Sequence, residues 1–299
     1  YFQTAAATRL KLDDDSRISL SNNDDGVSNT IFGKTAGDPD GAGDQNVFIG
    51  ELAAGAGTQT DAADNNVGIG WSALTSLTIG HNNTAVGKSA MYSIVDGTYN
   101  TAVGSGALDL CVDGVRNVSL GGLAHSNADT GNFNVAVGYQ AGYIVTGDSN
   151  ITIGDTAGVA LNSGNQNILI GQSSGDALTG VQEGHVAIGS HALGRMATAN
   201  EANHLTNDVK IANVALGYYA LSSLSGGGDS NIAIGTYAYG GKTSGDVRGA
   251  DNVIIGTRAG KNLTDSDQNI VIGKDAFSTA STTSKVVAIG HEALKSANA

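Results

Sequence analysis

The stretch NTAVGSGAL, residues 100–108, decides the fold of this chain because near-copies of it recur throughout the sequence. NTAVGKSAM begins seventeen residues earlier, and NVAVGYQAG begins thirty-four residues later. Aligning the chain on an apolar residue followed by glycine gives fifteen copies, most of them 17 residues apart. Self-similarity at a short, fixed period is the signature of a solenoid, in which each repeat forms one coil stacked on its neighbours.

Within each copy the pattern is Asn, apolar, any residue, apolar, Gly, and then Ala three residues later. Alternating apolar positions indicate a short β-strand, and recurring glycines and β-branched residues argue against helix. The sequence therefore predicts an all-β parallel β-solenoid of about fifteen coils, with stacked Asn amides bonding from coil to coil. The residues chosen to represent the structural repeat are Asn46, Gly50, Asn83, Gly87, Asn100, Gly104, Asn117, Gly121, Asn134, Gly138, Asn150, Gly154, Asn231, Gly235, Asn252 and Gly256.

The residue in the middle of each predicted strand leads to a prediction about oligomeric state. We expect the two apolar positions flanking this residue to face the coil interior, so that the middle residue points outward. That residue is itself apolar in most copies, and a strand apolar on both faces is normally covered on both. The pattern therefore predicts a homo-oligomer that packs along this stripe. The predicted interface residues are Phe48, Ala85, Ala102, Ala136, Leu169, Ala187, Ala215, Ala233, Ile254, Val271 and Ala288.

Composition and charge exclude several classes of function. A net charge of −13 argues against a nucleic-acid partner, which would require clustered Lys and Arg. No apolar run approaches the ~20 residues of a membrane-spanning helix, so we expect no membrane insertion by this segment. We also expect no metal or other cofactor. The acidic stretch Asp38–Asp44 leaves ion binding open as a lesser alternative to an acidic turn.

Motif-like stretches are explained by the repeat. GQSSG, residues 171–175, fits a nucleophile pattern around Ser173, but Gly171 is the repeat glycine of its copy. The strand-to-helix setting that such a nucleophile needs is missing from the pattern. We therefore predict no enzyme.

The chain divides into three parts. Residues 1–3 resemble the remnant of a tag, and residues 4–28 alternate apolar and polar around an Asp-rich turn, which predicts a β-hairpin that caps the first coil. Residues 29–299 form the repeat region, with longer loops near residues 54–65, 194–212 and 240–251. Loops on a repeat scaffold are favoured places for recognition. The candidate receptor contacts are Arg195, Asn200, His204 and Lys210.

The NTAVG and NVAIG copies resemble the head repeats of YadA-like trimeric autotransporter adhesins and the related repeats of phage tail-fibre proteins. The resemblance covers about residues 29–295. It implies a left-handed β-roll, a homotrimer, and an extracellular role on a virion or a bacterial surface. The seventeen-residue period departs from the shorter coil usual in adhesin heads and is closer to the tail-fibre type.

The main functional hypothesis is a structural, adhesive segment of a longer trimeric fibre that presents or forms a region binding a host glycan or protein receptor. A tailspike-like, polysaccharide-degrading solenoid is the alternative, because such enzymes place two carboxylates in a groove. Glu201, Asp208 and Asp246 lie in the long loops and keep that alternative open. A monomeric ice-binding solenoid would require an outward ladder of Thr, which the repeat lacks.

Overall fold

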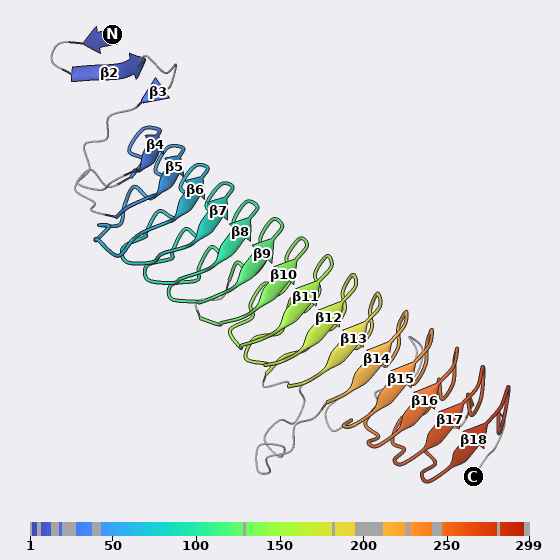
Figure 1. Cartoon of the computed structure of the whole chain (residues 1–299). Helices are drawn as coiled ribbons and strands as arrows, with labels where there is room; N and C mark the ends of the chain where they lie inside the picture. The colour runs from blue at the N-terminus through green and yellow to red at the C-terminus, as the bar shows by residue number, and fades with distance from the viewer. Residues whose placement is uncertain are drawn as a thin grey trace. The chain divides into compact units, whose positions relative to one another are not determined.

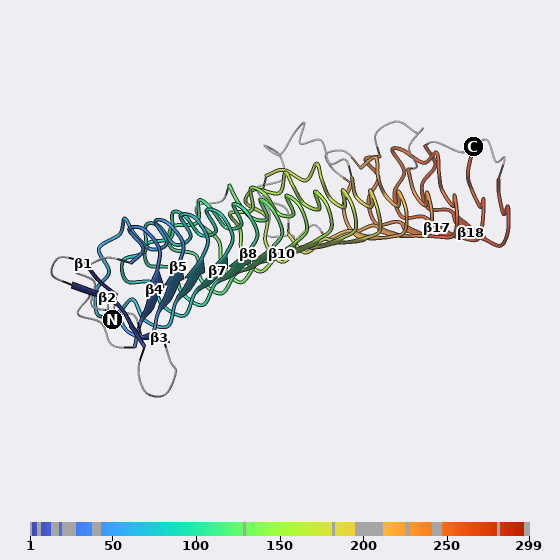
Figure 2. The same ribbon diagram turned by 90° about the horizontal axis from the view of Figure 1, so that it is seen from above.

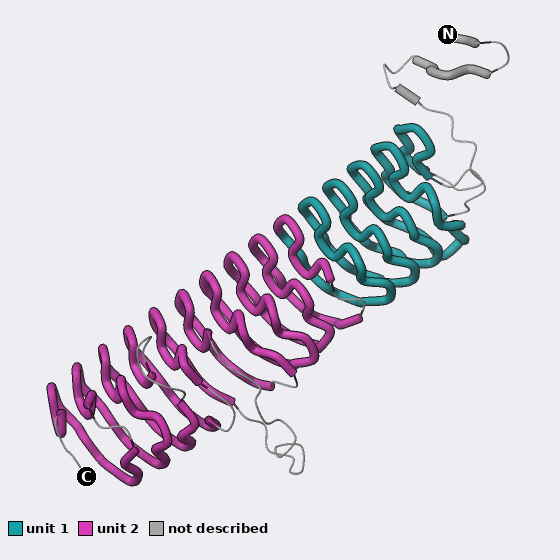
Figure 3. Tube along the Cα trace, turned by 180° about the vertical axis from the view of Figure 1, so that it is seen from behind, with its two compact units in different colours: residues 1–120 teal, residues 121–299 magenta. Residues whose placement is uncertain are grey.

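The computed structural model describes residues 2–4, 7–12, 18–19, 28–37, 43–127, 130–180, 183–194, 212–224, 228–240, 247–279 and 282–295. None of these residues is helical, and those from residue 28 onward form a parallel β-solenoid with a period near 17 residues. Contacts divide the chain into two compact units, residues 1–120 and 121–299, coloured separately in Figure 3. The predicted fold class is confirmed.

The first unit contains a small antiparallel sheet and six coils. In the small sheet β2 pairs antiparallel with β1 and with β3. The hairpin cap over residues 4–28 stays a prediction. The coil strands β4 to β9 pair in parallel with their sequence neighbours. The strands are β1 (Phe2–Thr4), β2 (Ala7–Leu12), β3 (Ile18–Ser19), β4 (Thr30–Phe32), β5 (Val47–Ile49), β6 (Val67–Ile69), β7 (Thr84–Val86), β8 (Thr101–Val103) and β9 (Val118–Leu120).

The second unit contains nine parallel strands in sequence order (Figure 1). Its register is constant: Ala187 pairs with Ala215, although 28 residues separate them, and Ala215 pairs with Ala233. The long insertion before β14 therefore leaves the strand ladder unchanged. The strands are β10 (Val135–Val137), β11 (Ile151–Ile153), β12 (Ile168–Ile170), β13 (Val186–Ile188), β14 (Val214–Leu216), β15 (Ile232–Ile234), β16 (Val253–Ile255), β17 (Ile270–Ile272) and β18 (Val287–Ile289).

A stacked glycine ends each coil strand after three residues. Gly138 has a φ of +129°, which L side chains rarely adopt. A Cβ placed on it would lie 2.6 Å from the carbonyl oxygen of Gly154 in the next coil. Glycine is therefore required both by the backbone conformation and by the close approach of the next coil.

The Asn side chains form the predicted ladder and also anchor the backbone. Asn150 Oδ1 accepts the backbone N–H of Asn167 at 3.0 Å and its side-chain N–H at 3.0 Å. Asn150 Nδ2 donates to the Gly164 carbonyl at 2.8 Å. Because Asn150 is 1% exposed, these bonds satisfy polar groups that have no access to water.

The middle residue of each three-residue coil strand lies inside the coil, so the predicted outward orientation of these residues is wrong. Every residue predicted for the oligomer interface is at most 2% exposed within the single chain. The alternation is as predicted but its phase is shifted by one residue, which exchanges the two faces of a strand. The residues that were predicted for the interface and lie in the core instead are Phe48, Ala85, Ala102, Ala136, Leu169, Ala187, Ala215, Ala233, Ile254, Val271 and Ala288.

Inside the coil, the middle strand residue packs against the residue four positions after the glycine. A Cβ at Gly175 would lie 2.8 Å from a Leu169 methyl group, so Leu169 leaves no room for a side chain at that facing position. In several other coils a small middle residue faces a large one. Pairs of this kind are Leu169 with Gly175, Ile254 with Gly260, Ala187 with Leu193 and Ala215 with Leu221. In these pairs the size of one residue offsets the size of the other.

Candidate functional site

The outer face of the strands is apolar and partly exposed. It consists of the first and third residue of each coil strand, which lie on either side of the buried middle residue; Figure 2 shows the strands along one side of the coils. In the second unit all eighteen of these residues are Val, Ile or Leu. Ile188 is 41% exposed, Ile270 is 40% exposed and Ile289 is 64% exposed. The flanking positions, and not the predicted middle ones, therefore form the apolar surface.

A second surface follows the glycines. We call the first and second residues after each repeat glycine the edge columns. In the second unit the column of second residues holds a stack of rings from three consecutive coils. The His191 and Tyr219 ring centroids lie 4.5 Å apart with an interplanar angle of 21°, and those of Tyr219 and Tyr237 lie 5.5 Å apart with an interplanar angle of 13°. Tyr218 contacts both Tyr219 and Tyr237 at nearly right angles.

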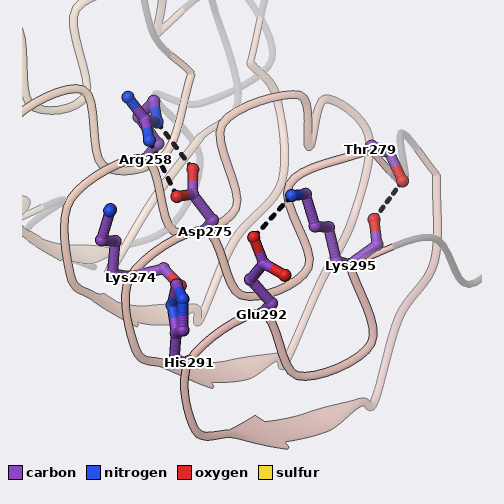
Figure 4. Close-up of polar contacts among 7 residues, drawn as sticks. All are labelled: Arg258, Lys274, Asp275, Thr279, His291, Glu292 and Lys295. Carbon is purple, nitrogen blue, oxygen red and sulfur yellow. Dashed lines mark hydrogen bonds and ion pairs between the residues drawn. The ribbon is translucent and has the colours of Figure 1, made fainter.

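The same column continues with charged residues. Arg258 donates to both carboxylate oxygens of Asp275, from Nε at 2.6 Å and from Nη2 at 2.8 Å (Figure 4). This hydrogen-bonded guanidinium lowers the pKa of Asp275. Glu292 in the next coil pairs with Lys295 at 2.6 Å. The edge columns thus carry the chemically varied side chains, while the strands and their ladders are uniform.

Two histidines are buried in the second unit. His185 occupies an Asn position of the ladder, and burial lowers its pKa to about 4. His125 Nε2 lies 2.8 Å from the Val145 carbonyl oxygen, and burial lowers its pKa to about 4 as well. Because a carbonyl can only accept, His125 donates from Nε2 and is neutral with an unprotonated Nδ1. Both histidine side chains are almost fully buried, with His185 0% and His125 1% exposed.

The predicted receptor contacts Arg195, Asn200, His204 and Lys210 lie outside the described residues, as do Glu201, Asp208 and Asp246. Of the stretch Asp38–Asp44, only residues 43 and 44 are described. The loop near residues 54–65 is described in full, and its Gln59 side chain is buried and donates to the Ala54 carbonyl at 2.6 Å.

The motif around Ser173 has a simple structural setting. Ser173 lies in an edge column, and its hydroxyl is 3.0 Å from that of Thr156, the equivalent residue one coil earlier. Within the part of the chain that the structure describes, no three His, Cys, Asp or Glu side chains gather as metal ligands would. Over the same residues, no helix has the length and hydropathy needed to cross a membrane.

Fold and surfaces together define a β-solenoid repeat protein with uniform coils, one apolar outer face and chemically varied edges. Comparison of the chain with protein-family models, curated proteins and solved structures finds no match.

Proposed function

We propose that this chain is a structural, non-enzymatic segment of an extracellular trimeric fibre, as in a phage tail fibre or a bacterial surface adhesin. In this proposal its coils give a stiff support, and its variable edges and loops meet the host receptor. The observation that carries the proposal is the apolar outer face of the strands. The resemblance of the repeats to those of trimeric adhesins and tail fibres supports three chains per fibre.

The outer face is too extensive for ordinary surface scatter. Parallel sheets are almost always covered on both faces, yet here only the inner face is covered by the chain itself. The largest apolar patch on a typical soluble monomer is roughly 300–600 Å². Eighteen contiguous Val, Ile and Leu side chains over nine coils, with exposed fractions up to 64%, favour burial by a partner.

A second copy of the chain is the partner that best matches this face. Neighbouring strands repeat at about 4.8 Å, and the outer residues repeat with them. A partner that packs along nine coils must present the same axial repeat, as another copy does. Burial of such a face would couple assembly to stability, since the separate chain would expose it to water.

The test is the solution mass of the native protein by light scattering. We expect three chains for the wild type. Ile170→Lys combined with Ile188→Lys places charges on the outer face and should yield single chains. Gln172→Lys combined with Thr257→Lys adds the same charge at exposed edge positions, and this variant should still contain three chains. A wild-type protein that stays monomeric at tens of micromolar would overturn the proposal.

A further inference from the structure

The geometry points to a carbohydrate-binding site on the edge columns of the second unit, with Tyr218 as a stacking platform for a pyranose ring. This inference names a receptor class for the proposed fibre and to that extent rests on the proposed function. Its evidence is independent, because it comes from the edge columns and not from the outer face of the strands.

The ring stack fixes how Tyr218 lies. Tyr219 sits between His191 in the preceding coil and Tyr237 in the following coil, so both of its faces are covered. Tyr218 is nearly perpendicular to Tyr219, with centroids 4.6 Å apart and planes at 84°. It therefore cannot place its edge on a face of Tyr219; instead the edges of the stacked rings meet one face of Tyr218.

The opposite face of Tyr218 remains available. The residue is 47% exposed, and its contacts with two rings of the stack hold its orientation. A rigid, exposed aromatic face suits a flat ligand surface, because little side-chain entropy is lost on binding. The electron-rich face of a phenol ring attracts the slightly positive C–H groups that line one side of many pyranose rings.

Polar groups follow the platform in the same column. The next two coils place Thr236 and Thr257 at the position of Tyr218, and both residues are exposed. Their hydroxyls make no hydrogen bond to the described residues, so they are available to sugar hydroxyls. Tyr218 leans toward this side, since its ring centroid lies 5.6 Å from that of Tyr237 in the next coil.

Arg258 directly follows Thr257 in the chain and lies in the neighbouring edge column, that of Tyr219 and Tyr237. Its Nε and Nη2 are held by Asp275, which fixes the plane of the guanidinium, and within the described part of the chain Nη1 makes no hydrogen bond. A guanidinium held in this way is a preordered fork of donors, which loses little freedom when it binds a hydroxyl group. An oligosaccharide lying along the two edge columns would pass from stacking on Tyr218 to hydrogen bonds with the threonine hydroxyls and the Arg258 guanidinium.

Other ligands of aromatic surfaces fit less well. Quaternary ammonium groups are bound in cages where several ring faces converge, whereas here one face is open and the other rings present edges. Single-stranded nucleic acid also stacks on tyrosines, but it needs a basic groove, and this chain has a net charge of −13.

The experiment uses the full chain on an array of glucosides, galactosides, mannosides and uronate-containing oligosaccharides, followed by calorimetry with the best ligand. We expect wild type to bind, Tyr218→Ala to bind about tenfold more weakly, and Tyr218→Phe to bind like wild type. Tyr139→Ala is the matched control. Tyr139 occupies the equivalent position in another coil and is 53% exposed, but has no ring partner among the described residues.

The inference is overturned if no oligosaccharide binds, if Tyr218→Ala and Tyr139→Ala weaken binding equally, or if Tyr218→Phe loses as much affinity as Tyr218→Ala. Light scattering on the same samples keeps this inference separate from the proposed function. Three chains without sugar binding would contradict only the carbohydrate site, and a single chain that binds sugar through Tyr218 would contradict only the fibre.

Discussion

The imidazole Nδ1 of His185 accepts the backbone N–H of Asn213 at 3.1 Å. Elsewhere in the ladder the oxygen of an Asn side chain is the acceptor. Asn213 Oδ1, for example, accepts the backbone N–H of Asn231 at 2.9 Å. The imidazole can replace an amide here only while Nδ1 is unprotonated. One ladder position is therefore sensitive to pH, whereas its Asn equivalents are not.

We predict that His185→Asn stabilises the protein in acid. The folded pKa is about 4, whereas the ordinary histidine pKa is 6.5, so below about pH 6.5 the unfolded chain takes up a proton that the folded chain does not bind. Stability linked to His185 is thus complete above pH 6.5 and declines as the pH falls toward 4. By pH 4.5 the loss is on the order of 2–3 kcal/mol.

Denaturant unfolding at pH 7.5 and pH 4.5 checks this prediction. The wild type should lose more stability between the two values than His185→Asn does, while carboxylates common to both proteins titrate alike. Equal losses would show that His185 is not the titrating group.

The core pair Leu169 and Gly175 should behave as a coupled unit. Leu169→Ala alone should cost about 2–5 kcal/mol by leaving a cavity. Gly175→Leu alone should cost about 1–3 kcal/mol, because its Cβ would lie 2.8 Å from the Leu169 side chain. Leu193 adopts the same left-handed backbone, with φ +52° against +58° at Gly175, so leucine is compatible with the position.

The double variant has the same residue pair as Ala187 and Leu193 in the next coil, although the added Cβ would still lie 2.9 Å from the Leu178 side chain. Its destabilisation should be below the sum of the single effects. A double-mutant cycle from unfolding free energies measures the coupling. Additive effects would mean that the two positions do not share one space in the core.

Breaking the Asn ladder should be costly at a single position. Asn150→Ala removes the acceptor of the buried Asn167 N–H and the donor to the Gly164 carbonyl. Two buried backbone groups without partners should cost about 2–4 kcal/mol. Gln172→Ala, at an exposed position one coil away, should change the unfolding free energy by less than about 0.5 kcal/mol. A similarly small effect for Asn150→Ala would argue against a structural role for the ladder.

The period, the strands and the Asn ladder could be predicted from the sequence, because Asn, Gly and Ala recur at fixed offsets and each has one backbone role. The inward face could not be assigned from alternation alone, since Val135, Ala136 and Val137 are all apolar. The overlooked signal was that a large residue at one position accompanies a small residue at the other, as with Leu169 and Gly175, which indicates that both positions face one core. The alignment places His191, Tyr219 and Tyr237 at the same offset from their glycines, but the aromatic stack was missed because a shared offset does not show that the rings face one another.

The most direct test of the account is the reactivity of a thiol placed on the outer face of the native protein. Ile188→Cys lies at a position 41% exposed in the single chain, Thr236→Cys lies at an exposed edge position, and the natural Cys111 is buried. If sister chains cover the outer face, the cysteine at position 188 should react with a thiol reagent far more slowly than the one at position 236. Equal rates in the native protein would contradict the central claim that this apolar face is an interface between copies.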